Sequence, residues 1–102
     1  LAVKIALANN TPIKSVGAGT IIFSDLTPSS GYVVIVRHKD DILSVYKNAA
    51  SVTKSQGNIV KAGEVIALAG NANTVQNSGA TLHFELWKDG FPIDPTQFIN
   101  FN

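Results

Sequence analysis

Turn-forming residues recur every few positions along this chain, and no stretch between them has the apolar spacing of a helix longer than a turn or two. The strongest segment, residues 32–38, carries four consecutive β-branched residues, which is typical of a strand buried on both faces. Residues 81–87 alternate cleanly between two sets of side chains, and a hairpin turn at residues 88–90 follows them. The pattern predicts an all-β chain of about seven to nine short strands, folded as a sandwich or a partly open barrel.

Further strands are predicted from short apolar runs bounded by turn residues. They cover residues 2–8, 13–23 with a bulge or tight bend at Gly17 and Gly19, 42–46, 59–60, 65–69 and 91–93. Residues 47–56 and 70–79 are rich in small polar side chains, and we expect both stretches to be irregular. Asp94 followed by Pro95 is expected to start a short helical turn near the end of the chain.

Length and composition exclude several classes of protein. The 102 residues leave room for one core, so we expect a single domain over residues 1–102. The net charge is +1 and no basic stripe is present, which argues against nucleic-acid binding. The absence of cysteine excludes disulfide scaffolds and thiol catalysis, and no apolar run approaches the roughly 18 residues of a membrane helix. Because the chain starts at Leu1 with no visible signal peptide, we expect an N-terminally incomplete piece of something longer.

The strand predicted over residues 81–87 carries the best candidate for chemistry. Its alternation gives a core face with Leu82, Phe84 and Leu86 and a polar face with Thr81, His83, Glu85 and Trp87. His83 is either a half-exposed histidine on a sheet or one ligand of a metal site built on that face. One imidazole does not hold zinc, which needs at least three protein ligands. The other histidine, His38, is expected on the surface where its strand ends.

Several segments together resemble the LytM/lysostaphin-type zinc endopeptidases, a family of peptidoglycan hydrolases. The segments are Gly-Tyr-Val-Val-Ile-Val-Arg-His at 31–38, Ser-Val-Tyr at 44–46, Val-Lys-Ala-Gly-Glu-Val-Ile-Ala-Leu-Ala-Gly at 60–70, Leu-His-Phe-Glu-Leu at 82–86, Asp-Gly at 89–90 and Asp-Pro at 94–95. They occur in the family's order and spacing. The resemblance implies a compact antiparallel β-sheet of the LytM-like type, with a groove and little or no helix. It also implies a periplasmic or otherwise extracytoplasmic location in the bacterial cell envelope.

The chain departs from this family at the positions that carry its chemistry. In the family, two histidines and one aspartate hold zinc, and further histidines assist the bound water. Lys4 stands where the family's aspartate ligand belongs, and the histidine paired with that aspartate would fall before Leu1. Thr81 and Asn48 replace the two assisting histidines, which leaves His83 as the one ligand-type residue retained. The resemblance is therefore to degenerate LytM-like domains, such as those of EnvC-type amidase activators and of some sporulation-complex scaffolds.

Such a domain is expected to be a catalytically inactive binding or activator module. The implied partner is a cell-wall amidase or another envelope-complex protein, and peptidoglycan is a further candidate. We expect no metal site and no cofactor, with the ancestral zinc lost. The candidate groove residues for partner binding are Lys4, Tyr46, Asn48, Thr81, His83 and Glu85. Lys4 is a candidate to pair with Glu85 or with a carboxylate of the partner.

Other hypotheses stay open at the level of sequence. An active zinc metalloendopeptidase that cleaves peptidoglycan cross-links requires that Lys4 does not stand at the ligand position and that Asp or His ligands come from elsewhere. It also requires His38 to enter the site. A direct binder of cell-wall glycan or peptide would use the groove without cleaving. A further alternative is that the groove binds nothing at present and is a relic of an ancestral peptidase. A biotinyl- or lipoyl-type carrier needs a lysine at a hairpin tip between two acidic or hydrophobic residues. Lys61 and Lys88 lie in turns, but neither has such neighbours.

Overall fold

The computed structural model of the chain describes residues 2–70 and 80–97, and within these ranges the regular structure is almost entirely antiparallel strand. Two short 3-10 turns, η1 (Lys39–Asp41) and η2 (Pro95–Gln97), complete it. The strands are β1 (Val3–Leu7), β2 (Pro12–Lys14), β3 (Gly19–Thr27), β4 (Gly31–Arg37), β5 (Ile42–Val52), β6 (Ile59–Val60), β7 (Val65–Ala69), β8 (Ala80–Lys88) and β9 (Phe91–Ile93). The predicted all-β fold is confirmed. No helix in the described ranges is long and apolar enough to cross a membrane.

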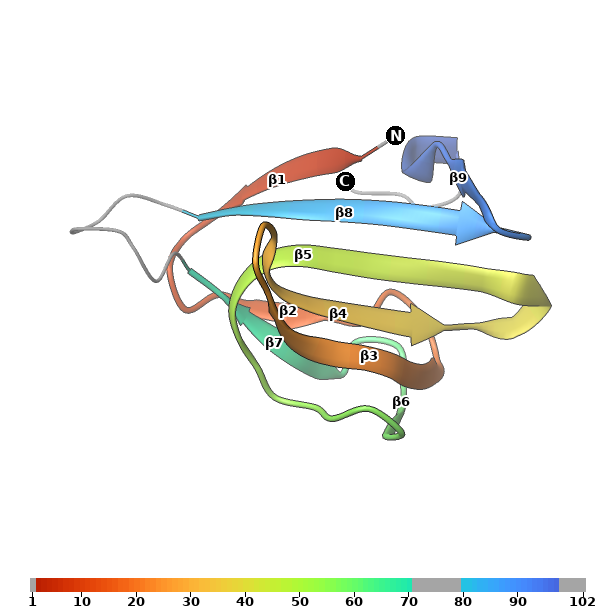
Figure 1. Ribbon diagram of the computed structural model, residues 1–102, viewed down its shortest axis with the longest axis horizontal. Coiled ribbons are helices and arrows are strands. Elements are labelled where there is room, and N and C mark those ends of the chain that lie inside the picture. The colour runs from red at the N-terminus through yellow and green to blue at the C-terminus, as the bar shows by residue number, and fades with distance from the viewer. Residues whose placement is uncertain (1, 71–79, 98–102) are drawn as a thin grey trace.

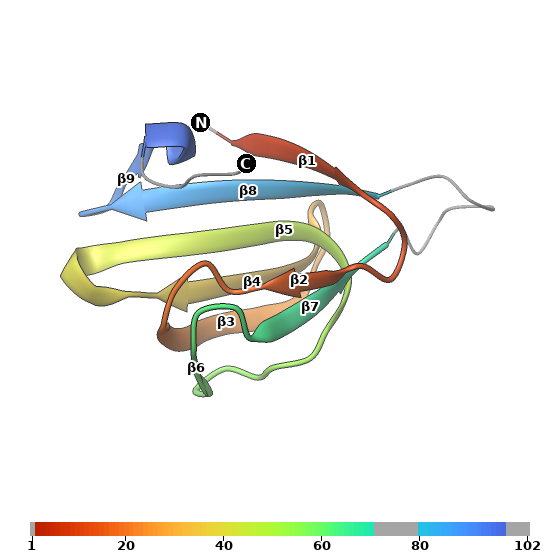
Figure 2. The same ribbon diagram turned by 180° about the vertical axis from the view of Figure 1, so that it is seen from behind.

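The strands form one sheet that folds back over itself. Its main path runs β1-β8-β5-β4-β3-β6, while β7 pairs with both β5 and β2, and β9 pairs with β8. Figure 1 shows the long strands β8, β5, β4 and β3 side by side. Seen from behind in Figure 2, β2 and β7 lie over β4 and β3. The short pair therefore covers one face of the long strands, and no other strand of the described residues lies over the opposite face.

The core lies between the long strands and the β2–β7 pair. Its largest fully buried side chains are those of Tyr46, Phe84, Ile21, Ile66, Val34 and Val36. On β8, Leu82, Phe84 and Leu86 are buried and the residues between them are half-buried, so the predicted two-faced alternation is confirmed. The prediction that residues 32–38 form a strand buried on both faces also holds, because consecutive valines of β4 are 5% and 0% exposed.

One predicted boundary was wrong. The stretch 47–56 is not irregular throughout, because β5 continues to Val52 by pairing with β7, with Ala49 opposite Ala69. The strand predicted over 13–23 is two strands, β2 and β3, and the chain bends between them at the predicted place, where the Ser15 hydroxyl donates to the Gly17 carbonyl. Gly19 is required at the start of β3, since a Cβ there would meet the Arg37 carbonyl oxygen.

The C-terminal turn was predicted correctly. Asp94 Oδ1 accepts hydrogen bonds from the Thr96 backbone N–H at 3.0 Å and from the Thr96 hydroxyl at 2.7 Å, as expected of a cap. Most of the loop predicted over residues 70–79 lies outside the described residues.

Candidate functional site

Three strands bring nitrogen-bearing side chains together on the face that β2 and β7 leave uncovered. Lys4 of β1 lies directly opposite His83 of β8, and Lys47 of β5 lies opposite His83 on its other side. Directly opposed residues of antiparallel strands share a face and have Cβ atoms about 4.5–5.5 Å apart. The row Lys4–His83–Lys47, with Thr81 and Glu85 flanking His83 along β8, is called the polar face below.

Glu85 is held by two donors within this face. Lys47 Nζ lies 2.9 Å from Glu85 Oε2, and Trp87 Nε1 donates to Glu85 Oε1 at 3.0 Å. Partial burial opposes ionisation of the carboxyl, but the hydrogen bonds from Lys47 and Trp87 together outweigh it and lower the pKa of Glu85. Lys4 was a candidate to pair with Glu85, but in the structure Glu85 forms its ion pair with Lys47. Sequence reasoning missed Lys47, because it placed this residue beyond the end of its strand.

Removal of the Lys47 charge is expected to give a small, pH-dependent loss of stability. Because the folded pKa of Glu85 lies below its ordinary value of 4.5, the ion pair stabilises the fold above that value. This contribution is lost as the pH falls through the folded pKa. We expect Lys47→Met to cost less than about 1 kcal/mol at pH 7, since the pair is partly exposed. Urea unfolding over a pH series measures it, with Lys14→Met as control. If Lys47→Met lowers the free energy of unfolding by the same amount at every pH, the Lys47–Glu85 ion pair is not the source of the loss.

Asn48 connects β5 to β8. Its backbone takes a positive φ of 71° at a bulge, a conformation that asparagine tolerates better than most residues. Its Nδ2 donates to the Thr81 carbonyl oxygen at 2.7 Å, and its backbone N–H donates to the Ser30 carbonyl at 2.7 Å. The Asn48 side chain thus lies against the β8 backbone at Thr81. The asparagine amide is engaged in a structural contact and does not titrate near neutral pH.

Tyr46 does not belong to the polar face, and its assignment as a groove residue was wrong. Its side chain is 1% exposed, and its ring centroid lies 5.3 Å from that of Phe84 in the core. The Tyr46 oxygen accepts from the Val16 backbone N–H at 3.0 Å and from the Ser44 hydroxyl at 2.9 Å. Burial raises the pKa of Tyr46, and the hydrogen bonds offset this only in part. Because strand side chains alternate, Lys47 faces His83 and Tyr46 faces away.

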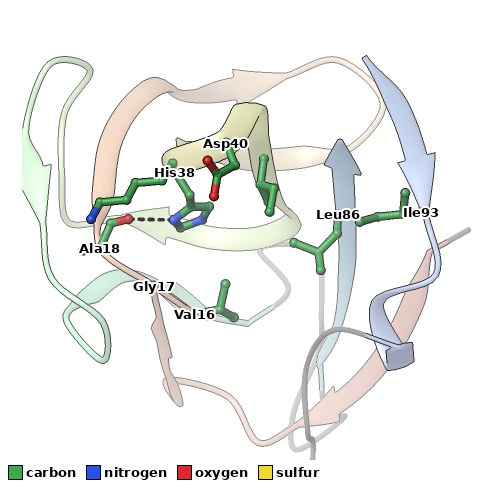
Figure 3. Close-up of a pocket in the computed structure, with 9 residues that line it drawn as sticks. Val16, Gly17, Ala18, His38, Asp40, Leu86 and Ile93 are labelled. Atoms are coloured by element: carbon green, nitrogen blue, oxygen red, sulfur yellow. Dashed lines mark hydrogen bonds between the residues drawn. The ribbon is translucent and has the colours of Figure 1, made fainter. Parts of the chain in front are cut away.

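His38 lies on the other side of the sheet from His83. Its Nδ1 lies 2.8 Å from the Ala18 carbonyl oxygen and its Nε2 lies 2.7 Å from Ser44 Oγ. It lines a pocket of about 490 Å³ together with Leu86, a residue of the core face of β8, as Figure 3 shows. His38 therefore does not lie near His83. The enzyme hypothesis required His38 to enter the site, and the structure does not place it there.

The donor set on the polar face does not fit a zinc peptidase centre. His83 is the one ligand-type residue at the expected positions, and a protonated Lys4 has no lone pair to offer a cation. Within residues 2–70 and 80–97, no three His, Cys, Asp or Glu side chains come close enough to hold a metal ion. The residues between these ranges contain none of the four types.

The comparisons with known proteins agree on one family. The model of "Peptidase family M23" matches residues 1–95. Stage II sporulation protein Q of Bacillus subtilis is 36% identical over 83 residues, which cover 81% of this chain and 29% of that protein. The DD-carboxypeptidase/endopeptidase Mpg of Neisseria meningitidis is 31% identical over 88% of this chain and 20% of its own length. A lipoprotein NlpD/LppB homolog of Pseudomonas aeruginosa is 29% identical, with 86% and 29% covered.

Solved structures give the same result. A chain of the SpoIIQ–SpoIIIAH pore-forming complex superposes with a TM-score of 0.75 at 33% identity, covering 88% of this chain and 58% of that one. Lysostaphin, at 22% identity and a TM-score of 0.85 over 95% of this chain and 41% of its own, shares the fold. This chain spans less than a third of the length of each of these curated relatives. With its LytM/lysostaphin-type fold and a family match over residues 1–95, the chain belongs to peptidase family M23.

Proposed function

We propose that this chain is a catalytically inactive M23 domain of the bacterial cell envelope that binds a protein partner. The partner is a peptidoglycan hydrolase such as a cell-wall amidase, or another envelope-complex protein. The observation that carries this proposal is the pairing of Lys4 directly opposite His83. An ammonium group stands where a metal centre on this face needs a carboxylate, and it repels a cation rather than binding one.

The residues beside His83 support the same proposal. A zinc peptidase needs a group that moves protons near neutral pH, which a threonine hydroxyl or an asparagine amide does not supply. Thr81 and Asn48 stand at these two positions, and the Asn48 amide is already bonded to the β8 backbone. The polar face thus keeps the scaffold of the family without its chemistry.

The relatives support a binding role in the envelope. Sporulation protein Q is 36% identical to this chain, and its solved structure is that of a complex with SpoIIIAH. Another relative is named a lipoprotein, which favours an extracytoplasmic location for this chain as well. The relative Mpg is named as an enzyme, so the peptidase activity is the alternative that experiment has to separate.

Replacement of the exposed polar face is expected to abolish partner binding and leave the fold intact. The variant carries Lys4→Ala, Thr81→Ala and His83→Ala, three side chains that are exposed or half-buried. We expect its unfolding free energy to stay within about 2 kcal/mol of the parent chain. Cell-wall amidases and envelope subunits of the source organism, purified one at a time, are tested for binding and for stimulation of amidase activity.

The control for this experiment is Lys14→Ala, an exposed lysine on β2, which covers the opposite face of the sheet. It should retain full binding. A folded triple variant that binds and stimulates as well as the parent chain contradicts a binding role for the polar face.

A further inference from the structure

We propose that Lys4 and His83, with the Thr81 hydroxyl beside them, form a carboxylate-binding site that receives an Asp or Glu side chain from an acidic segment of the partner. This inference rests on the proposed function, because it names the chemistry of the partner for the same face.

The charges on the polar face are not balanced. Both oxygens of Glu85 are occupied, one by Lys47 and one by Trp87, so the Lys47 charge is neutralised within the face. Lys4 has neither an ion pair nor a side-chain hydrogen bond among the described residues, and the same holds for the His83 ring. A cation and an imidazole therefore lie side by side, unpaired with any anion of the described residues, and each carries at least one N–H donor.

The Lys4 side chain is accessible to another protein. β1 pairs with β8 alone in the part of the chain that the structure describes, so Lys4 lies on a strand at the edge of the sheet. The residues two positions to either side of Lys4 are Ala2, just before β1, and Ala6 on β1, and both are exposed and small. No large side chain of this strand covers the ammonium group, and a partner's backbone can approach it closely.

Donor geometry and charge favour a carboxylate as the occupant. A carboxylate accepts from several donors through its two oxygens, and charge-assisted hydrogen bonds to it are stronger than neutral ones. The opposed positions of Lys4 and His83 place two nitrogen groups on adjacent strands, and Thr81 adds a hydroxyl two residues along β8. The occupant that this site fits is a side chain of an acidic peptide segment, not a component of the glycan strand.

The site is tested by NMR titration of the ¹⁵N-labelled chain with a synthetic peptide, acetyl-Ala-Glu-Ala-Glu-Ala-amide. Its counterpart with Gln in place of both Glu residues is the neutral control. We expect the Glu peptide to shift the amide signals of Lys4, Thr81 and His83 and to bind about two- to fivefold more tightly than the Gln peptide. Lys4→Gln should lose the same factor, and Lys14→Gln should lose none. About 0.5 M NaCl should remove the difference between the peptides.

Three results overturn the inference. They are equal binding of the Glu and Gln peptides, undiminished binding of the Glu peptide by a folded Lys4→Gln variant, and Lys4-dependent binding of purified peptidoglycan without binding of the Glu peptide. The proposed function fails separately, when the polar-face triple variant still captures and stimulates the partner. The two proposals can therefore fail separately. If the Glu and Gln peptides bind equally well but the triple variant loses its partner, carboxylate recognition is wrong and the binding role of the polar face is retained.

Discussion

Phe84→Ala is expected to lower the free energy of unfolding by about 3–5 kcal/mol. The ring is 1% exposed at the centre of β8 and lies against the Tyr46 ring, with centroids 5.3 Å apart. Its removal loses the transfer free energy of a large apolar group and leaves a cavity between the long strands and the β2–β7 pair. Urea unfolding monitored by circular dichroism measures the change.

The control for this substitution is the adjacent residue on the same strand. His83 faces the opposite side of the sheet and is half-buried, with no described side-chain hydrogen bond. We expect His83→Ala to cost less than about 1 kcal/mol. Equal costs for the two substitutions contradict the assignment of opposite faces on β8.

Tyr46→Ala is expected to destabilise the chain by a similar amount, about 3–5 kcal/mol. This substitution removes a core ring and also leaves the Val16 N–H and the buried Ser44 hydroxyl without the oxygen that they contact. Tyr46→Phe separates the two effects, since it keeps the ring and removes the oxygen. We expect that variant to cost about 1–3 kcal/mol, the penalty of leaving buried polar groups unpaired.

The Tyr46 pair of variants also decides between two roles for this residue. If Tyr46 is a core residue, its substitution lowers the stability of the fold, and partner binding decreases only in proportion to the fraction of folded chain. If Tyr46→Ala stays within about 1 kcal/mol of the parent chain and still loses its partner, Tyr46 is a binding residue and its place in the core is wrong. The measurements are urea unfolding and partner capture at matched folded concentration.

The strand period made the faces of β8 predictable, but contacts between strands were not predictable from the sequence. Alternation alone assigned Leu82 to the core and His83 to the polar side, and both assignments are confirmed. The family motifs placed Lys4 at the same site as His83, and the two are now found opposite each other. These predictions succeeded because they depend on local spacing or on motifs in a known order.

The errors arose where tertiary pairing overrides local composition. The small polar residues after Tyr46 indicated a loop, but β7 supplies a pairing partner and extends β5 to Val52. Lys47 was therefore left out of the site, although it holds Glu85. The network from His38 through Ser44 to the Tyr46 oxygen was also beyond sequence reasoning, because it joins the end of β4 to the core.

The central claim is that the polar face carries an M23 scaffold without a zinc centre, and zinc content tests it most directly. The purified chain is dialysed against trace zinc and analysed for metal, with a His83→Ala variant in parallel. We expect far less than about one zinc per chain in both samples, because a zinc site needs at least three protein ligands and this face offers His83 beside Lys4. About one zinc per chain, bound more tightly than micromolar and lost in His83→Ala, contradicts the account.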